Sequence, residues 1–520
     1  MNTFRKLPIG VQDFEDLRTN NYLYVDKTAY IYQLITSGKP YFLSRPRRFG
    51  KSLFLSTLKA YFLGKKDLFE GLAIAGREKE WDTYPVIYID FNRGMNLDAQ
   101  TLRETLLYNL KLSGEQMDIR VEEENPSVRF SELIRRAYER TGRKVVVLVD
   151  EYDKPLLNTM DKPPVNDEIR DVLKSFYGVL KGMDACLRFV FLTGVTKFSK
   201  VSIFSDLNQL QDISMDERYA GVCGISEADL LRDFQPELQA LAGKRNITPD
   251  QAFAEIKKRY DGYHFAIRSE DIYNPFSVLN TFSLLEFRHY WFQTGTPTFL
   301  VKMVKDVDFD IPTLENDVKV PAQSIMDYRE ENPDPVPVLY QSGYLTIKSY
   351  NELTDIYTLG FPNEEVKYGF FDELMMIYMP GKRTRGEFSA GLFVEDLWDN
   401  NIDGFMTRLQ AFFAGIPYEL HNKEEKHFQT VFYILFRLMG QFIAVEHRSA
   451  TGRADAVVTT KDAVYVFEFK LAATASAEEA LRQIDEKGYL LPFAAGHRKL
   501  IKIGVAFSLE ARGITQWAMN

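Results

Sequence analysis

The sequence predicts an α/β protein with a parallel sheet in its N-terminal part, and two observations support this fold class. Short apolar runs there have the length of buried strands, and amphipathic stretches such as Ser52–Phe62 and Phe130–Arg140 lie between them. This alternation is typical of βαβ units, in which helices cover a parallel sheet. The four predicted strands are Tyr41–Leu43, Val86–Phe91, Val145–Val149 and Phe189–Leu192.

The following region, residues 226–380, reads mainly as helices. It also contains a two-strand signal, Tyr344–Ile347 and Ile356–Leu359, around a polar turn near Asn351. We therefore predict a helical, winged-helix-like middle region after an N-terminal domain of residues 1–225. The segment Met379–Gly386 combines turn residues with three cations and is expected to be an exposed linker.

The last part, residues 387–520, is predicted to be a separate α+β domain. Glu425–Met439 has a helical apolar period, and Gly440 is a plausible stop signal. Two alternating runs follow, near Arg453–Val458 and Ala463–Lys470. A helix over Ala477–Leu490 and a final strand over Leu500–Phe507 complete the expected domain.

Composition limits the functional classes. The chain has 520 residues, of which 45% are hydrophobic and 26% charged, which excludes a disordered or fibrous protein. The net charge of −9 provides no global attraction for nucleic acid, so such contact requires a local basic patch. With only two cysteines, scattered histidines and no apolar run long enough to cross a membrane, we expect a cytoplasmic protein without a zinc site or membrane partner.

A candidate phosphate-binding loop, Arg45–Ser52, follows the first predicted strand and opens a helix. Its spacing is that of GxxxxGK(S/T), with Arg45 in place of the first glycine. Backbone amides of such a loop hold phosphate oxygens, Lys51 reaches the β- and γ-phosphates, and Ser52 binds Mg²⁺. ATP and Mg²⁺ are therefore the expected cofactors, and the candidate ligands in the loop are Arg45, Arg47, Arg48, Phe49, Gly50, Lys51 and Ser52. A solvated basic turn is the alternative.

Carboxylates end the third predicted strand, as in a Walker B motif. Asp150 is the candidate Mg²⁺ ligand, and Glu151 is placed to orient or deprotonate the attacking water. Thr193, at the end of the next strand, is the candidate sensor of the γ-phosphate, with Lys197 as a weaker candidate. Alternatively, Asp150 and Glu151 only cap a helix. Loss of the first loop glycine also leaves open a site that binds ATP without hydrolysing it.

Several motifs together carry a resemblance to a known family. They are Tyr24–Thr28, Arg45–Ser52, Val149–Pro155, Thr193–Lys197, Tyr260–His264, Asn274–Ser277 and Gln341–Thr346. The chain resembles the bacterial AAA-ATPase-like family, in which a P-loop domain is joined to a C-terminal domain of the PD-(D/E)xK nuclease superfamily. The resemblance implies an AAA-like P-loop fold, a winged-helix-like middle and a restriction-endonuclease-like C-terminal domain. In that family an arginine at the position of Arg45 is usual, and Asp26 and Lys27 lie near the nucleotide; as an alternative, Asp26 caps a turn.

A carboxylate and lysine cluster is predicted in the C-terminal domain. If the two alternating runs form a hairpin centred between Lys461 and Asp462, Asp455 faces Glu468. Strand periodicity then places Lys470 on the same face as Glu468. Asp455 and Glu468 would bind Mg²⁺, and Lys470 would orient a water or stabilise charge during phosphodiester cleavage. A surface ion-pair ladder is the alternative.

Neighbouring residues extend this predicted site. Glu425 would complete the metal shell or form a capping box with Asn422. Gln483 and Tyr489 occupy positions where this superfamily often has Gln and Tyr, and packing or capping is the alternative. The basic residues that could follow phosphates are Arg448, Arg453, Arg482 and Lys487.

The expected function follows from these sites. We expect an ATP-binding protein, with or without hydrolysis, coupled to a Mg²⁺-dependent nuclease-like domain that acts on nucleic acid, foremost DNA. One alternative is a nucleotide-dependent switch or interaction protein whose nuclease-like domain does not cleave. Another keeps the nuclease and treats the P-loop as a relic. The sequence is compatible with an oligomer.

Overall fold

The structure is a computed structural model, and it forms two compact units, Met1–Lys367 and Tyr368–Asn520. In the described part of the chain, no helix has the length and apolar character needed to cross a membrane. The described residues are 5–197, 209–292, 298–307, 309–315, 318–325, 334–378, 389–414, 425–442, 444–446, 454–473, 475–508, 510–511 and 513–520.

A five-stranded parallel sheet forms the centre of the first unit, in the order β2-β3-β4-β1-β5. All four predicted strands are present, and the prediction missed only β5, which is two residues long. In this order, β4 separates β1, which precedes the P-loop, from β3, which ends in the acidic pair. The strands are β1 Pro40–Ser44, β2 Val86–Asp90, β3 Val145–Asp150, β4 Leu187–Gly194 and β5 Gln211–Asp212.

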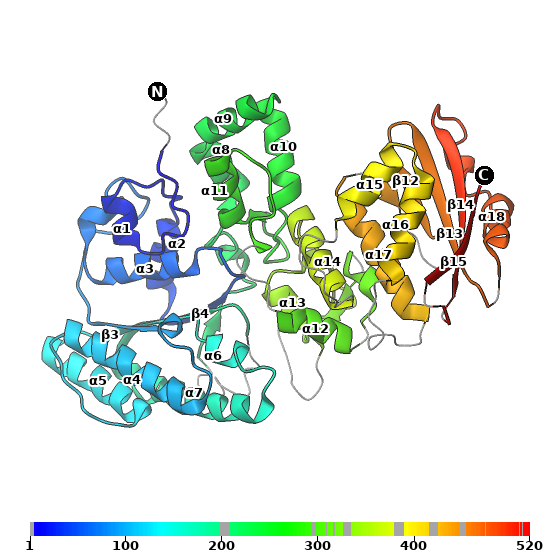
Figure 1. The fold of residues 1–520 in the computed structure, drawn as a ribbon. Coiled ribbons are helices and arrows are strands. Elements are labelled where there is room, and N and C mark those ends of the chain that lie inside the picture. The colour runs from blue at the N-terminus through cyan, green and yellow to red at the C-terminus, as the bar shows by residue number, and fades with distance from the viewer. Residues whose placement is uncertain are drawn as a thin grey trace. The chain divides into compact units, whose positions relative to one another are not determined.

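Helices cover both faces of this sheet (Figure 1). One face carries α1 (Phe14–Thr19), α2 (Thr28–Ser37) and α3 (Lys51–Phe62), and the other carries α4 (Ala99–Gln116), α5 (Pro126–Thr141) and α7 (Pro163–Gly182). Local sequence fixes the ends of these helices. The Asn125 side chain accepts hydrogen bonds from the first turn of α5, and Gly142 ends that helix in the left-handed conformation.

A group of four helices follows in the same unit: α8 (Glu227–Asp233), α9 (Gln235–Arg245), α10 (Pro249–Tyr260) and α11 (Pro275–Leu284). Their apolar faces share one core. Ile9, Leu23 and Val25 from the N-terminal segment pack against this core. Residues before the first strand therefore line the space between the sheet and the helical group.

The rest of the first unit contains the predicted two-strand pair. Strands β9 (Thr346–Asn351) and β10 (Ile356–Gly360) form the predicted antiparallel pair. A third strand, β8 (Val318–Pro321), pairs with β10 and was not predicted. Helices α12 (Thr298–Asp306) and α13 (Pro335–Gln341) accompany this small sheet.

The second unit contains a mixed sheet in the order β11-β12-β13-β14-β15. The strand predicted at Leu500–Phe507 is present as β14, but it is not the last one, since β15 follows it. The helix predicted to reach Leu490 ends at Glu486, because Gly488 adopts a left-handed φ of 63°. The predicted linker Met379–Gly386 lies outside the described residues. The strands are β11 Ala444–Glu446, β12 Ala456–Thr459, β13 Ala463–Leu471, β14 Lys499–Ser508 and β15 Gly513–Met519.

Alternation along β13 separates the two faces of this sheet. Phe467 and Phe469 contact aromatic rings of the helices on one face, which are α15 (Ala390–Trp398), α16 (Ile402–Ala414) and α17 (Glu425–Met439). Val464 and Val466 pack in a separate core with Ile484 of α18 (Ala477–Glu486). Because side chains alternate along a strand, Glu468 and Lys470 belong to the α18 face. Helix α14 (Glu364–Tyr378) precedes this domain.

Candidate nucleotide and metal sites

The P-loop, Arg45–Ser52, has a backbone that returns tightly to the start of α3. Gly50 caps the helix with a φ of 92°, and Arg48 has a φ of 69°. The Lys51 ammonium donates to the carbonyl oxygens of Arg45 (3.0 Å) and Pro46 (3.1 Å). These bonds hold the ammonium inside the loop, and Lys51 is only 6% exposed. The lysine is therefore placed to meet a phosphate bound by the amides of the same loop.

The side chain of Arg45 does not line the cavity beside the P-loop, which is described below. It is buried, and its guanidinium donates to the carbonyl oxygens of Ser44 (2.9 Å), Ser214 (2.8 Å) and Tyr219 (3.1 Å). The central carbon of the guanidinium, Cζ, lies 4.1 Å from the centre of the Phe265 ring. Burial lowers the pKa of Arg45. In this conformation the side chain connects β1 to the segment after β5 and does not reach into the cavity.

Segments from the middle region support the back of the P-loop. The Phe49 ring packs edge-on against Tyr263, with ring centres 4.7 Å apart. The Trp291 indole donates to the Arg47 carbonyl at 3.1 Å. A Cβ at Gly343, which has a φ of 86°, would lie 2.6 Å from the Pro46 ring. The motifs that contain Tyr263 and Gly343 therefore pack against the loop, and Phe49 both takes part in this packing and lines the cavity described below.

Asp150 is the last residue of β3 and Glu151 follows it, which is the position predicted for a Walker B pair. Asp150 is 2% exposed, and its Oδ1 has no hydrogen-bond partner among the described residues. Burial, with a further contribution from the Glu151 charge, raises the pKa of Asp150 to about 6. A hydrogen bond with Ser52 and the charge of Lys51 act in the opposite direction. Ser52 and Asp150 thus lie together, as ligands of one Mg²⁺ ion require.

The loop after β4 is held by a buried carboxylate that the sequence analysis did not assign. Asp153 accepts hydrogen bonds from the backbone amides of Val195 (3.0 Å) and Thr196 (2.5 Å). The predicted sensor Thr193 is fully buried, and its hydroxyl has no partner in the described part of the chain. Lys197 forms an ion pair with Asp212 of β5, so its charge is already compensated.

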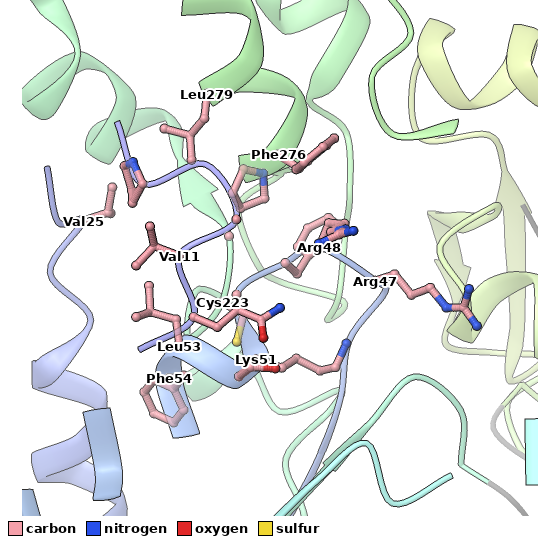
Figure 2. A pocket seen from close by; sticks show the side chains of 18 of the residues that line it. Val11, Val25, Arg47, Arg48, Lys51, Leu53, Phe54, Cys223, Phe276 and Leu279 are labelled. Carbon is pink, nitrogen blue, oxygen red and sulfur yellow. The ribbon is translucent and has the colours of Figure 1, made fainter. Parts of the chain in front are cut away.

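A cavity of about 670 Å³, which is the size of a small-molecule site, lies beside the P-loop. Its polar end contains Arg47, Arg48, Lys51, Ser52 and Glu151. Figure 2 shows Val11, Val25 and Leu279 together on another side of the cavity. The further apolar lining includes Pro8, Ile9, Val222, Ile225 and Phe276. A ligand with a charged end and an apolar ring system would match this arrangement.

Asp26 and Lys27 have structural partners close to this cavity. Asp26 accepts a hydrogen bond from the Thr28 amide at the start of α2, as the capping alternative predicted. Its other oxygen accepts from the Ala73 amide. Lys27 lines the cavity and forms an ion pair of 2.6 Å with Asp229 of α8. Lys27 therefore links the N-terminal segment to the helical group.

In the second unit, the hairpin has the register that places the predicted acids opposite each other. Ala456 pairs with Phe467 and Val457 with Val466, so Asp455 continues the ladder opposite Glu468. Asp455 accepts a hydrogen bond of 2.8 Å from the Phe469 amide. Lys470 contacts the Oε1 of Glu468 at 2.9 Å. Two carboxylates and one ammonium therefore meet at this end of the hairpin.

The chemistry of this cluster suits a divalent cation. Glu468 is 3% exposed, and its Oε2 has no hydrogen-bond partner among the described residues. Burial raises the pKa of both Asp455 and Glu468, and the charge of Asp455 raises that of Glu468 further. A cation bound by both carboxylates would remove this cost, since it compensates the buried charges. In the described ranges, no group of three or more His, Cys, Asp or Glu side chains that could hold a metal ion is present.

The remaining predicted residues of this site are placed as follows. Gln483 of α18 donates to the Oε1 of Glu468 and lies 3.4 Å from the Tyr489 hydroxyl. Both residues thus form part of the cluster, and Gln483 contacts a carboxylate directly. The Arg482 and Lys487 side chains are exposed. Arg448 and Arg453 lie outside the described residues, as does the side chain of Glu425, the first residue of α17.

Sequence reasoning missed several residues of the cavity. Cys223, which had been assigned no functional role, lines the cavity. Phe276 belongs to a motif, Asn274–Ser277, to which no role had been assigned. Its ring lies 5.2 Å from the Arg48 guanidinium. The available signal was the motif itself, which the Asn274 cap at the start of α11 explains only in part.

Comparisons with known proteins agree with both halves of this description. A family model described as "Predicted AAA-ATPase" matches residues 8–204, and one described as "PD-(D/E)XK nuclease superfamily" matches residues 423–517. The chain is also 39% identical over 531 residues to the "Uncharacterized protein in vnfD 5'region" of Azotobacter chroococcum mcd 1, covering 99% of each chain. The chain therefore belongs to the family of predicted AAA-ATPases that carry a C-terminal domain of the PD-(D/E)XK nuclease superfamily.

Proposed function

We propose that the first unit binds and hydrolyses Mg²⁺-ATP. The phosphates would lie on the P-loop amides beside Lys51, and the adenine would enter the apolar part of the cavity near Val11 and Val25. Ser52 and Asp150 would hold Mg²⁺, which neutralises charge on the phosphates. The observation that carries this proposal is a cavity of about 670 Å³ lined by Lys51, Ser52 and Glu151, with the buried Asp150 next to Ser52.

Glu151 would orient and deprotonate the attacking water. It follows Asp150 directly, lines the cavity and has a φ of 51°, which is uncommon for a residue other than glycine. This conformation turns the chain at the end of β3. A catalytic base must lie within reach of the terminal phosphate, and the end of β3 beside the P-loop provides such a place.

Nucleotide binding can be tested by calorimetric titration with ATP and Mg²⁺. Wild type should bind, and Lys51→Ala should bind at least ten times more weakly, because a charge-assisted contact with phosphate is lost. Lys59→Ala on α3 is the matched control, since Lys59 is not part of the cavity lining. Equal affinities for wild type and Lys51→Ala would refute the nucleotide proposal. Glu151→Gln should bind normally but lose hydrolysis.

We further propose that the second unit is a metal-dependent nuclease. Asp455 and Glu468 would hold Mg²⁺, and the ion would polarise the scissile phosphate. Lys470 would orient the attacking water, and Gln483 would hold Glu468 in position. The observation that carries this proposal is the buried Oε2 of Glu468, which lies beside Asp455 and has no hydrogen-bond partner among the residues that the structure describes. Nucleic acid, foremost DNA, is the proposed substrate.

Cleavage can be tested with plasmid and oligonucleotide substrates in the presence of Mg²⁺ or Mn²⁺. Wild type should cut, and Glu468→Gln and Lys470→Ala should not. Lys461→Ala is the matched control, because Lys461 is an exposed lysine in the turn of the same hairpin. Metal binding without cleavage by wild type would contradict the nuclease proposal and support a nucleotide-dependent switch with a non-cleaving domain.

A further inference from the structure

One cation of the ATP cavity has no role in the function proposed above. Lys154 begins the short helix α6 (Lys154–Leu157) three residues after Glu151, and it lines the cavity. Its ammonium donates to the Oδ1 of Asn92 at 2.6 Å. Among the residues that the structure describes, no carboxylate lies within ion-pair distance of it. A half-buried cation thus borders the cavity with only a neutral partner.

The position of Lys154 follows from the strand order. β2 and β3 are neighbours, and Asp90 pairs with Asp150 at their carboxyl ends. Asn92 and Lys154 both follow these ends, so their hydrogen bond joins the two loops at the edge where the Walker B pair lies. Lys51 begins α3, after the loop that follows β1, and β1 lies on the other side of β4. The space next to the carboxyl end of β3 therefore has the Lys154 ammonium on one side and the Lys51 ammonium on the other.

The other cations of the cavity are Lys27, Arg47, Arg48 and Lys51, and three of them have partners elsewhere. The fourth, Arg47, extends away from Lys51 (Figure 2). Lys27 forms its ion pair with Asp229, and the guanidinium of Arg48 lies over the Phe276 ring. Lys51 is held by the P-loop carbonyls. Asn92 can hold Lys154 in place without neutralising it, and an ammonium has three donors, of which this bond uses one. Two donors of the Lys154 ammonium remain for an anion at the polar end of the cavity.

We infer that Lys154 binds the terminal phosphate of ATP from the side opposite to Lys51. This inference rests on the proposed function of the first unit. It assigns to the same chain a cation that stabilises charge on the transferred phosphoryl group, and it makes Asn92 a positioning residue. Because the β-phosphate lies deeper in the P-loop, the contact distinguishes a triphosphate from a diphosphate.

The test compares the affinities for a non-hydrolysable ATP analogue and for ADP, both with Mg²⁺, by calorimetric titration of the full chain. Lys154→Ala should weaken binding of the analogue by about 10-fold or more, as expected for one charge-assisted hydrogen bond, and leave ADP affinity within about 2-fold. Lys154→Arg should retain most of the preference for the analogue. Asn92→Asp should lose it, because the new carboxylate would pair with Lys154.

The controls separate this inference from the proposal on which it rests. Lys174→Ala removes an exposed lysine of α7 that does not line the cavity, and it should behave as wild type. If wild type binds the analogue and Lys154→Ala prefers the analogue over ADP as strongly as wild type does, the inference is wrong. The nucleotide proposal then stands. If wild type binds neither nucleotide, both are wrong. Unchanged melting of nucleotide-free Lys154→Ala shows that its fold is intact.

Discussion

The buried Asp150 carboxylate should make the nucleotide-free protein less stable as the pH rises. Its pKa is raised from 3.8 to about 6 in the folded state. Between these values the unfolded chain has released its proton while the folded chain retains it, so stability decreases with increasing pH. Above the folded pKa both states are ionised and the cost reaches its full value. Asp150→Asn removes this cost without changing the side-chain shape.

The magnitude follows from the same shift. One pKa unit corresponds to about 1.4 kcal/mol, so the ionised carboxylate costs about 3 kcal/mol near pH 7.5 and about 1 kcal/mol near pH 4.5. Asp150→Asn should therefore raise the melting temperature near pH 7.5 by several degrees, and by about a third as much near pH 4.5. Mg²⁺ with ADP should raise the melting temperature of wild type more than that of the variant.

Scanning calorimetry of the nucleotide-free protein at both pH values measures this difference. Asp161→Asn provides the control, because Asp161 is an exposed aspartate between α6 and α7. Its replacement should leave the melting temperature unchanged at both pH values. An Asp150→Asn protein that melts no higher than wild type near pH 7.5 would refute the reasoning. An equal gain at both pH values would also refute it, since the effect would not come from ionisation.

Three further predictions concern the supports of the two sites. Glu468→Gln should stabilise the metal-free protein, because it removes a buried charge. Mn²⁺ should raise the melting temperature of wild type but not that of this variant, because the variant lacks a proposed metal ligand. Arg45→Met should lower the free energy of unfolding by about 2–4 kcal/mol in urea titrations, since several buried carbonyl groups lose their donor. Gly343→Ala should weaken ATP binding in calorimetric titrations, because its Cβ would displace Pro46 in the P-loop; unchanged affinity would show that this contact does not position the loop.

Local patterns were sufficient to predict the parts of the fold that depend on short stretches of chain. The strand Val145–Asp150 was recognisable because all its residues are apolar up to the final acid, and all of them are buried. The register of the C-terminal hairpin was also predictable. A short polar turn fixes which residues of β12 and β13 are opposite each other, and this determined the position of Asp455 relative to Glu468.

Features set by distant contacts could not be predicted in this way. The motif at the P-loop suggested that Arg45 binds the nucleotide, but its side chain is taken up by carbonyl groups more than 160 residues away. The apolar part of the cavity combines the N-terminal segment with residues such as Cys223 and Phe276. Strand β8 has only four residues, and it is a strand because β10 provides its partner. A local pattern of apolar residues carries no information on contacts between segments that are distant in the sequence.

The contacts behind the P-loop have a consequence for how this protein can be divided experimentally. Tyr263, Trp291 and Gly343 all touch the loop, and all lie beyond the segment that the AAA-ATPase family model covers. A truncated protein ending near residue 204 would expose the Phe49 ring to water and leave the loop without its backing. Such a fragment is a poor choice for biochemical work, whereas one that ends after the compact unit Met1–Lys367 keeps every one of these neighbours.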